Sequence, residues 1–109
     1  MKGHLRVDET LANLVESGNL FSELFKDDTI SIEMYKPEQE DLQAPHDRDE
    51  LYLIISGNGT FRLKDDRCQF KAGDLLLVPK GVAHRFENFS EDFVTWVIFY
   101  GTPAAENRE

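Results

Sequence analysis

Residues 73–88 constrain the fold of this chain more than any other stretch. They read GDLLLVPKGVAHRFEN and fit the pattern G-x5-P-x-G-x2-H-x3-N at every fixed position, a match that chance would give on the order of 10⁻⁷ times per starting position. The apolar run 74–78 has the length of a strand, and Pro79-Lys80-Gly81 has the composition of a tight turn. In the second run, 83–88, His84 alternates with charged residues and is therefore expected on the inward face. The stretch predicts two short strands whose connecting turn returns a histidine to the interior.

Most of the remaining chain reads as short strands separated by turn residues, which is typical of a β-sandwich or barrel. Gly57-Asn58-Gly59 lies between two such runs and predicts a β-hairpin. Runs such as 51–55 are apolar on both faces, as expected for strands that are covered on both sides. The predicted strands are residues 20–25, 29–36, 50–56, 60–64, 67–70, 74–78, 83–88 and 93–100.

Three segments lie outside this series of strands. Residues 9–17 form a candidate helix at the N-terminal end, which Asp8 can cap and Gly18 can end. The acidic segment 37–45 is expected to be a solvated loop, and its alternative role is to form part of the rim of a binding site. Residues 102–109 are expected to be a flexible tail.

A second block, His46-x3-Glu50-x6-Gly57, lies upstream of the first. Together the two blocks resemble the two signature motifs of the cupin superfamily, and the resemblance covers residues 30–101. It implies an all-β fold, an antiparallel jelly-roll barrel (double-stranded β-helix) with a short N-terminal helix, and a single cupin domain over residues 1–109. It also implies a homodimer, since small cupins usually pair and a contact between N-terminal strands would cover an exposed sheet edge.

The resemblance places a divalent metal ion between the two blocks, with His46, Glu50 and His84 as its ligands. The spacing is consistent with this assignment, because His46 and Glu50 are four residues apart and point to the same side of a regular strand. Two imidazoles and one carboxylate suit a facial arrangement that leaves other coordination positions open. One Fe, Mn, Ni or Zn ion per chain is the expected cofactor.

One position departs from the cupin pattern. The complete first motif reads H-x-H-x3,4-E-x6-G, and its first histidine falls on Ala44, which cannot bind a metal. Three protein ligands are therefore expected, with at least two open positions on the metal. Gln43 is close enough in sequence to contribute an amide oxygen if the strand is bulged. His4 lies near the N-terminal end and is expected to be incidental.

Strand alternation also suggests which side chains line a pocket beside the metal. Tyr52, Phe86 and Trp96 are inward candidates, although such residues are more often plain core. Arg48 falls on the inward face of a regular strand and would there bind an anionic group of a ligand. A salt bridge at the surface is the alternative role for Arg48. Together with Gln43, these residues form the predicted pocket.

Composition limits the partners of the chain. The net charge is −9 at pH 7 and the pI is about 4.7, so the surface would repel phosphate backbones and anionic membranes. No apolar run is long enough for a transmembrane span, and the N-terminal residues lack the apolar stretch of a secretory signal. Cys68 is the only cysteine, which excludes an internal disulfide and fits a cytoplasmic protein. We expect a small-molecule ligand or substrate, with neither nucleic acid nor membrane as a partner.

Three functions are compatible with these features. The first is a metal-dependent enzyme of the dioxygenase, isomerase or lyase type that acts on a small organic molecule. The second is a non-catalytic cupin that binds or senses a metal or small ligand. The third is a structural protein without metal. The sequence alone does not separate the first two, because open metal positions permit catalysis without requiring it.

Overall fold

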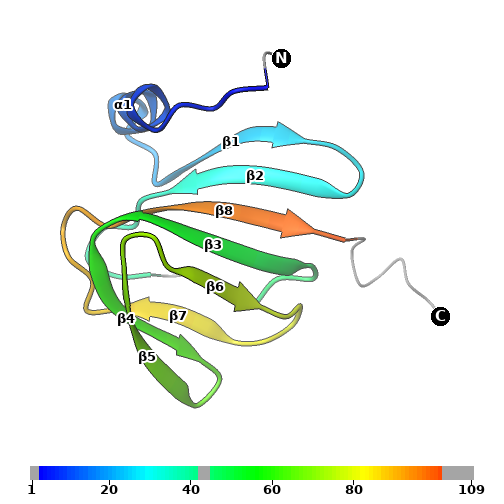
Figure 1. Ribbon diagram of the computed structural model, residues 1–109, viewed down its shortest axis with the longest axis vertical. Helices are drawn as coiled ribbons and strands as arrows, with labels where there is room; N and C mark the ends of the chain where they lie inside the picture. Colours follow the sequence, from blue (N-terminus) through cyan, green and yellow to red (C-terminus); the bar gives the residue numbers. More distant parts are fainter. Residues whose placement is uncertain (1–2, 42–44, 102–109) are drawn as a thin grey trace.

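The computed structural model describes residues 3–41 and 45–101, which form one helix and eight strands (Figure 1). All eight predicted strands are confirmed, with boundaries that differ by at most two residues. The elements are α1 (Val7–Ser17), β1 (Phe21–Lys26), β2 (Ile30–Tyr35), β3 (Asp49–Ser56), β4 (Asn58–Leu63), β5 (Asp66–Lys71), β6 (Leu75–Val78), β7 (His84–Glu87) and β8 (Val94–Tyr100).

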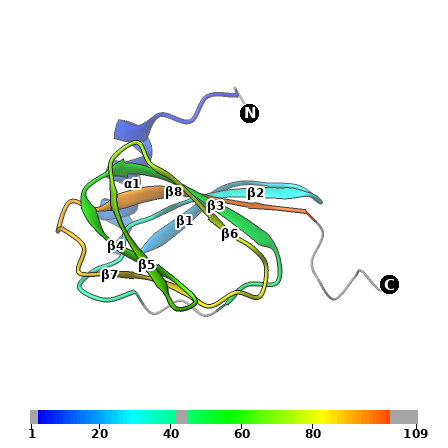
Figure 2. The ribbon, with the colours of Figure 1, turned by 60° about the horizontal axis from the view of Figure 1, so that its bottom comes forward.

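The strands form two antiparallel sheets that do not close into a barrel. One sheet has five strands in the order β1-β2-β8-β3-β6, and the other has three in the order β5-β4-β7. In Figures 1 and 2, β4, β5 and β7 lie on one side of the five-stranded sheet and α1 lies on the other. The all-β jelly-roll prediction is therefore confirmed, while the sheets pack face to face as separate layers and share no strand.

The predicted hairpin at Gly57 is wrong. Strands β3 and β4 flank Gly57, but they belong to different sheets and do not pair with each other. Gly57 has φ 89°, and a Cβ atom there would lie 2.5 Å from the Cα of Phe93, so the chain passes from one sheet to the other through a space that only glycine fits. A tight hairpin occurs instead between β4 and β5, where Leu63 pairs with Asp66.

The main hydrophobic core lies between the two sheets. Aromatic rings dominate it, and the centroids of Phe86 and Phe93 are only 4.7 Å apart. Both sheets contribute, so each sheet buries its inner face against the other. The buried members are Tyr52, Ile54, Phe61, Phe70, Val78, Phe86, Phe93 and Val97.

A second, smaller core lies on the outer face of the five-stranded sheet, under α1. Leu14 of the helix packs there with Met34 and Val94, and Trp96 packs against the same cluster. The prediction that Trp96 faces inward is therefore wrong. Successive side chains of β8 point to opposite faces of the sheet, and it is the face with Val97, not the face with Trp96, that lies against the main core. Because both faces of β8 carry mainly apolar side chains, alternation alone did not distinguish them.

The ends of α1 agree only in part with the prediction. Gly18 adopts the left-handed conformation and ends the helix, as predicted. Asp8, however, lies inside the first turn and pairs with Arg6 at 2.8 Å. Arg6 occupies the capping position, and its side chain makes no capping hydrogen bond to the helix backbone. Among the described residues, no helical segment has the length and apolarity needed to span a bilayer. The predicted tail at 102–109 lies outside the described residues.

Candidate metal centre

The turn after β6 holds the two motif blocks together. The Gly81 amide donates a hydrogen bond to the His46 carbonyl over 2.7 Å, and the Lys80 amide donates to Asp49 Oδ1 over 2.9 Å. Gly81 has φ 78°, which glycine adopts without steric cost. The turn thus returns His84, the first residue of β7, to a position opposite His46, as predicted, with the two ring centroids 5.6 Å apart.

Three side chains of the two motifs converge on one point. Glu50 Oε1 lies 3.2 Å from His84 Nε2 and 3.9 Å from His46 Nε2. One donor atom from each of the three residues lies within 4.8 Å of the others. Glu50 belongs to the five-stranded sheet, His46 lies in the loop three residues before the same strand, and His84 belongs to the three-stranded sheet. The group therefore spans the two layers.

The hydrogen bonding of this group fits a bound cation. His84 Nδ1 lies 2.9 Å from the Val82 carbonyl, which can only accept, so Nδ1 carries the proton and, in the neutral ring, Nε2 presents a lone pair toward Glu50. Both Glu50 oxygens and His84 Nε2 are buried and have no hydrogen-bond partner among the described residues. Buried polar atoms without partners are costly, and a metal ion would satisfy all three at once. The group could therefore hold a metal ion.

The surroundings of His84 act on its pKa in opposite directions. Burial lowers the pKa of His84, but the Glu50 carboxylate, the Val82 carbonyl and the charge of Asp41 raise it, and the net shift is upward. The negative electrostatic potential at the site thus favours a positive charge, either a proton or a metal ion.

A cavity of about 320 Å³ opens beside His46. Its wall is mainly aromatic and aliphatic, and His46 is the one member of the metal group that borders it, with its side chain 34% exposed. The ring of Phe99 contacts His46 edge-on at 4.8 Å. The lining residues are Phe21, Glu33, Tyr35, His46, Val97 and Phe99.

Sequence reasoning missed Phe21, Glu33 and Tyr35, which come from strands before the first motif. Strand β2 alternates between an apolar set and a more polar set that contains Ser31, Glu33 and Tyr35. Polar sets usually face water, but here this set is paired with inward residues of β8 and faces the cavity, while the apolar set faces α1. The alternation in β2 was therefore visible in the sequence. It would have suggested the opposite orientation, with the polar set of side chains facing solvent.

Glu33 contributes a carboxyl group to this wall. It is half-buried, and burial is the main cause that raises the pKa of its carboxyl group. The negative charges of Glu23 and Glu50 raise the pKa further, and Arg48 opposes them. Glu23 is the cross-strand partner of Glu33 on β1.

None of the predicted pocket residues that the structure describes lines the cavity, and Arg48 contacts it only through the lining residue Phe99. Its guanidinium group donates to Ser31 Oγ over 3.0 Å and lies 5.6 Å from the ring centroid of Phe99. Tyr52 and Phe86 are fully buried and belong to the main core, where Tyr52 contacts the His84 ring at 6.1 Å between centroids. Gln43 and Ala44 lie outside the described residues.

The acidic loop after β2 contains a buried residue that the sequence placed in solvent. Asp41 is 1% exposed and accepts hydrogen bonds from the Tyr35 hydroxyl at 2.7 Å and from the Phe86 amide at 2.9 Å. Burial and the Asp41 carboxylate raise the pKa of Tyr35. Asp41 therefore fixes the loop to β7 and orients Tyr35 in the cavity wall, and the prediction of a wholly solvated loop is wrong.

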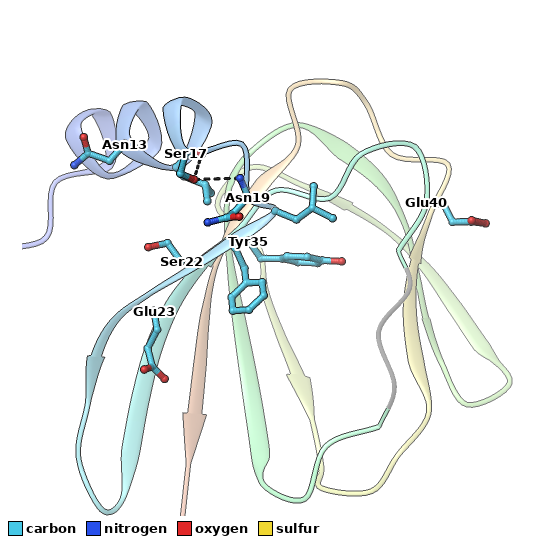
Figure 3. Close-up of a pocket in the computed structure, with 10 residues that line it drawn as sticks. Asn13, Ser17, Asn19, Ser22, Glu23, Tyr35 and Glu40 are labelled. Carbon is cyan, nitrogen blue, oxygen red and sulfur yellow. Dashed lines mark hydrogen bonds between the residues drawn. The ribbon is translucent and has the colours of Figure 1, made fainter.

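A second cavity, of about 720 Å³, adjoins the first between α1 and β1. The two cavities share Phe21 and Tyr35. Figure 3 shows Tyr35 pointing from β2 toward the loop that carries Glu40, with Asn13 and Ser17 on α1 and Asn19 just after it. The larger cavity is thus a vestibule next to the smaller one, with a lining that is mainly apolar and contains several polar side chains.

Two facing antiparallel sheets with a His-Glu-His group between them define a double-sheet jelly roll whose site could hold a metal ion. Residues 31–100 match the family model described as "Cupin domain", and the chain therefore belongs to the cupin family.

Similar proteins agree with this assignment. An uncharacterized protein of Streptomyces coelicolor is 30% identical over 96 residues, which cover 86% of this chain and 91% of that protein. An acireductone dioxygenase of Yarrowia lipolytica is 41% identical over 64 residues, which cover 53% of this chain but only 37% of that protein. A cupin of known structure from Methanocaldococcus jannaschii, with a double-stranded β-helix fold, superposes with a TM-score of 0.69 at 22% identity, over 81% of this chain and 84% of that one.

Proposed function

We propose that this protein is a metal-dependent cupin enzyme that acts on a small organic molecule, with one divalent ion per chain held by His46, Glu50 and His84. The observation that carries the proposal is the set of buried, unpartnered donor atoms on Glu50 and His84 directed at a common point beside a cavity. Two imidazoles and a carboxylate suit Fe, Mn, Ni or Zn. When bound, such an ion would act as a Lewis acid or activate O₂.

The protein side of the chemistry follows from burial. Glu50 and His84 are fixed and excluded from water, and the Val82 carbonyl holds the His84 ring in one tautomer. Tyr52 and Phe86 close the space behind His84, so a ligand would approach only from the side of His46. The aromatic wall would exclude water from the reacting end of the ligand.

The class of reaction that we favour is dioxygenation of an enediol. Support comes from the acireductone dioxygenase of Yarrowia lipolytica, which is 41% identical to this chain over 64 residues. That match spans little more than a third of the relative, so the activity is carried over as a proposal for this chain and not as a property of the family. An isomerase or lyase of small hydroxylated molecules would use the same site.

The test combines metal analysis with an oxygen-uptake assay. Protein purified without an affinity tag is expected to contain close to one equivalent of Fe, Mn, Ni or Zn, and to consume O₂ when an acireductone is added. His84→Ala is expected to lose both properties, whereas His4→Ala, at a histidine outside the group, keeps them. Absence of metal after reconstitution with all four ions would refute the proposal. Ligand-induced stabilisation without turnover would identify a binding or sensor cupin instead.

We further propose a homodimer and a reducing, cytoplasmic environment. β1 is an edge strand of the five-stranded sheet, and a second copy would cover it. Cys68 is exposed and unpaired, which suits a compartment that keeps thiols reduced.

A further inference from the structure

The cavity beside His46 contains one carboxylate in an otherwise aromatic and aliphatic wall. Glu33 lies on β2 opposite Val97 of β8, so its side chain shares the inward face of the sheet with the residues that line the cavity. The Tyr35 hydroxyl is the other polar group contributed by β2, and it already donates its proton to Asp41. Glu33 is therefore the acceptor that this part of the wall offers to a ligand.

The Glu33 carboxylate is not satisfied by the protein. Within the described part of the chain it has charge interactions with Glu23, Glu50 and Arg48 but no hydrogen bond. The Glu33 oxygens are not among the fully buried polar atoms of the described residues, so water can reach them, and a ligand hydroxyl would replace that water at a partly desolvated acceptor. Arg48 interacts with Glu33 through its charge only, and its guanidinium group donates a hydrogen bond to Ser31 Oγ.

We propose that Glu33 is a specificity-determining residue that accepts a hydrogen bond from a hydroxyl group of the ligand. The ligand class is a compact molecule with two neighbouring oxygen atoms, one directed to the metal group and one, as a hydroxyl, to Glu33. This inference rests on the proposed metal site, because His46 of that site borders the same cavity. It identifies the substrate class by an interaction that lies outside both sequence motifs.

The charges around the cavity favour a neutral hydroxyl group as the partner of Glu33, over a cationic amine or an anionic group. A cationic amine would lie in the same cavity as a divalent ion, and the two positive charges would repel each other. An anionic group at this end would meet the negative charges of Glu33 and Glu23. A hydroxyl group avoids both penalties and still donates a hydrogen bond to a charged acceptor, which is among the stronger kinds.

The volume of the cavity limits the size of the ligand. About 320 Å³ is at the lower end of the range for small-molecule sites. A catechol-sized diol would fit, and a longer substituent would extend past Phe21 and Tyr35 into the adjoining vestibule.

The test uses Co(II)-loaded protein, because the visible absorption of Co(II) reports ligands that reach the metal. Two probes are titrated, 4-nitrocatechol, which carries the diol, and azide, which binds metals without a hydroxyl group. Glu33→Gln is expected to weaken 4-nitrocatechol binding at least tenfold while the affinities for Co(II) and azide stay within twofold of wild type. Glu23→Gln removes the same charge from the neighbouring exposed position and is the matched control, expected to behave as wild type.

The outcomes separate the inference from the function on which it rests. Equal 4-nitrocatechol binding by wild type and Glu33→Gln, with Co(II) and azide still bound, would overturn the role of Glu33 and leave the metal site intact. An equal loss in Glu23→Gln would also overturn it, since the effect would then be one of charge alone. Failure of wild type to bind Co(II) would remove the metal site itself and, with it, this inference.

Discussion

At the scale of single residues, the charge of Glu33, in the wall of the proposed ligand site, affects the folding stability of the ligand-free protein. The folded chain raises the pKa of this group above its ordinary value of 4.5, mainly by burial. A carboxyl group whose pKa is raised on folding contributes most below its unfolded pKa, and this contribution is lost as the pH rises through the folded pKa. Residues that serve a ligand commonly carry such a cost in the ligand-free protein.

Glu33→Gln is therefore expected to stabilise the metal-free protein at neutral and alkaline pH. The amide cannot ionise, so it does not incur the cost of a half-buried charge facing Glu23 and Glu50. Urea unfolding in the presence of a chelator should show that the free-energy difference between variant and wild type is largest at about pH 8 and small at about pH 4. A difference that does not depend on pH would show that the charge of Glu33 is not its cause.

Asp41→Ala is expected to destabilise the fold. The change leaves the Tyr35 hydroxyl and the Phe86 amide without their acceptor, at a position that is 1% exposed. Each buried donor left unpaired costs about 1–3 kcal/mol, so the free energy of unfolding should fall by about 2–4 kcal/mol. Tyr35→Phe removes one donor and leaves Asp41 bound to Phe86, and a loss of about 1 kcal/mol is expected. Equal losses in the two variants would contradict a bridging role for Asp41.

The resemblance to the two cupin motifs predicted the group at His46, Glu50 and His84, and the spacing was consistent with it, because ligand types and turn residues are visible in a sequence. It did not predict Glu33 or Asp41, and the reason is the same for both. Each is an acidic residue whose surroundings are set by partners distant in sequence, Val97 for Glu33 and Phe86 for Asp41. Acidic residues are mostly exposed, and only the tertiary fold shows these two to be exceptions.

At the scale of elements, the strands were easier to predict than their pairing. Turn residues and apolar runs placed all eight strands, but they did not show that β3 and β4 belong to different sheets. The Gly57 segment has hairpin composition, and the packing of Phe93 against it decides the outcome. In β8 both alternating sets are apolar, so the face of Trp96 depended on the position of α1, which local sequence does not determine.

Gly57→Ala is expected to be one of the most damaging small substitutions in this chain. Two effects combine, a positive φ of 89° and a Cβ atom 2.5 Å from the Cα of Phe93. Gly73 is a matched control, since it has φ 92° but open space around its Cβ position. Gly73→Ala should cost about 1–2 kcal/mol from backbone strain alone, and Gly57→Ala clearly more. Equal losses in thermal or urea unfolding would show that the close approach to Phe93 relaxes without cost.

At the scale of the whole molecule, the two edges of the five-stranded sheet differ in their expected use. β1 and β6 are the edges, and each presents exposed apolar side chains, with Phe21 54% exposed on β1 and Leu77 57% exposed on β6. The proposed homodimer uses β1. Pairing there would cover an open edge in a chain whose net charge of −9 otherwise favours separation.

Phe21→Lys is expected to give a monomer, and Leu77→Lys a dimer. Both changes place a charge on an exposed apolar site at an edge of the same sheet, so they differ chiefly in which edge they affect. Light scattering of wild type should give about twice the chain mass of 12.6 kDa. A wild-type mass of one chain over a wide concentration range would contradict the dimer, and dissociation by Leu77→Lys alone would move the interface to β6.

Glu50 belongs to one layer of the molecule and His84 to the other, and His46 lies in the loop that leads into the strand of Glu50. An ion bound by all three would therefore link the two layers directly, in addition to the side-chain packing between them. When metal is scarce, the two layers of the metal-free protein would separate more often and expose the aromatic rings between them to proteases. The lifetime of the chain in a cell would then follow the supply of metal, so that the protein persists where its cofactor is present and is cleared where it is not.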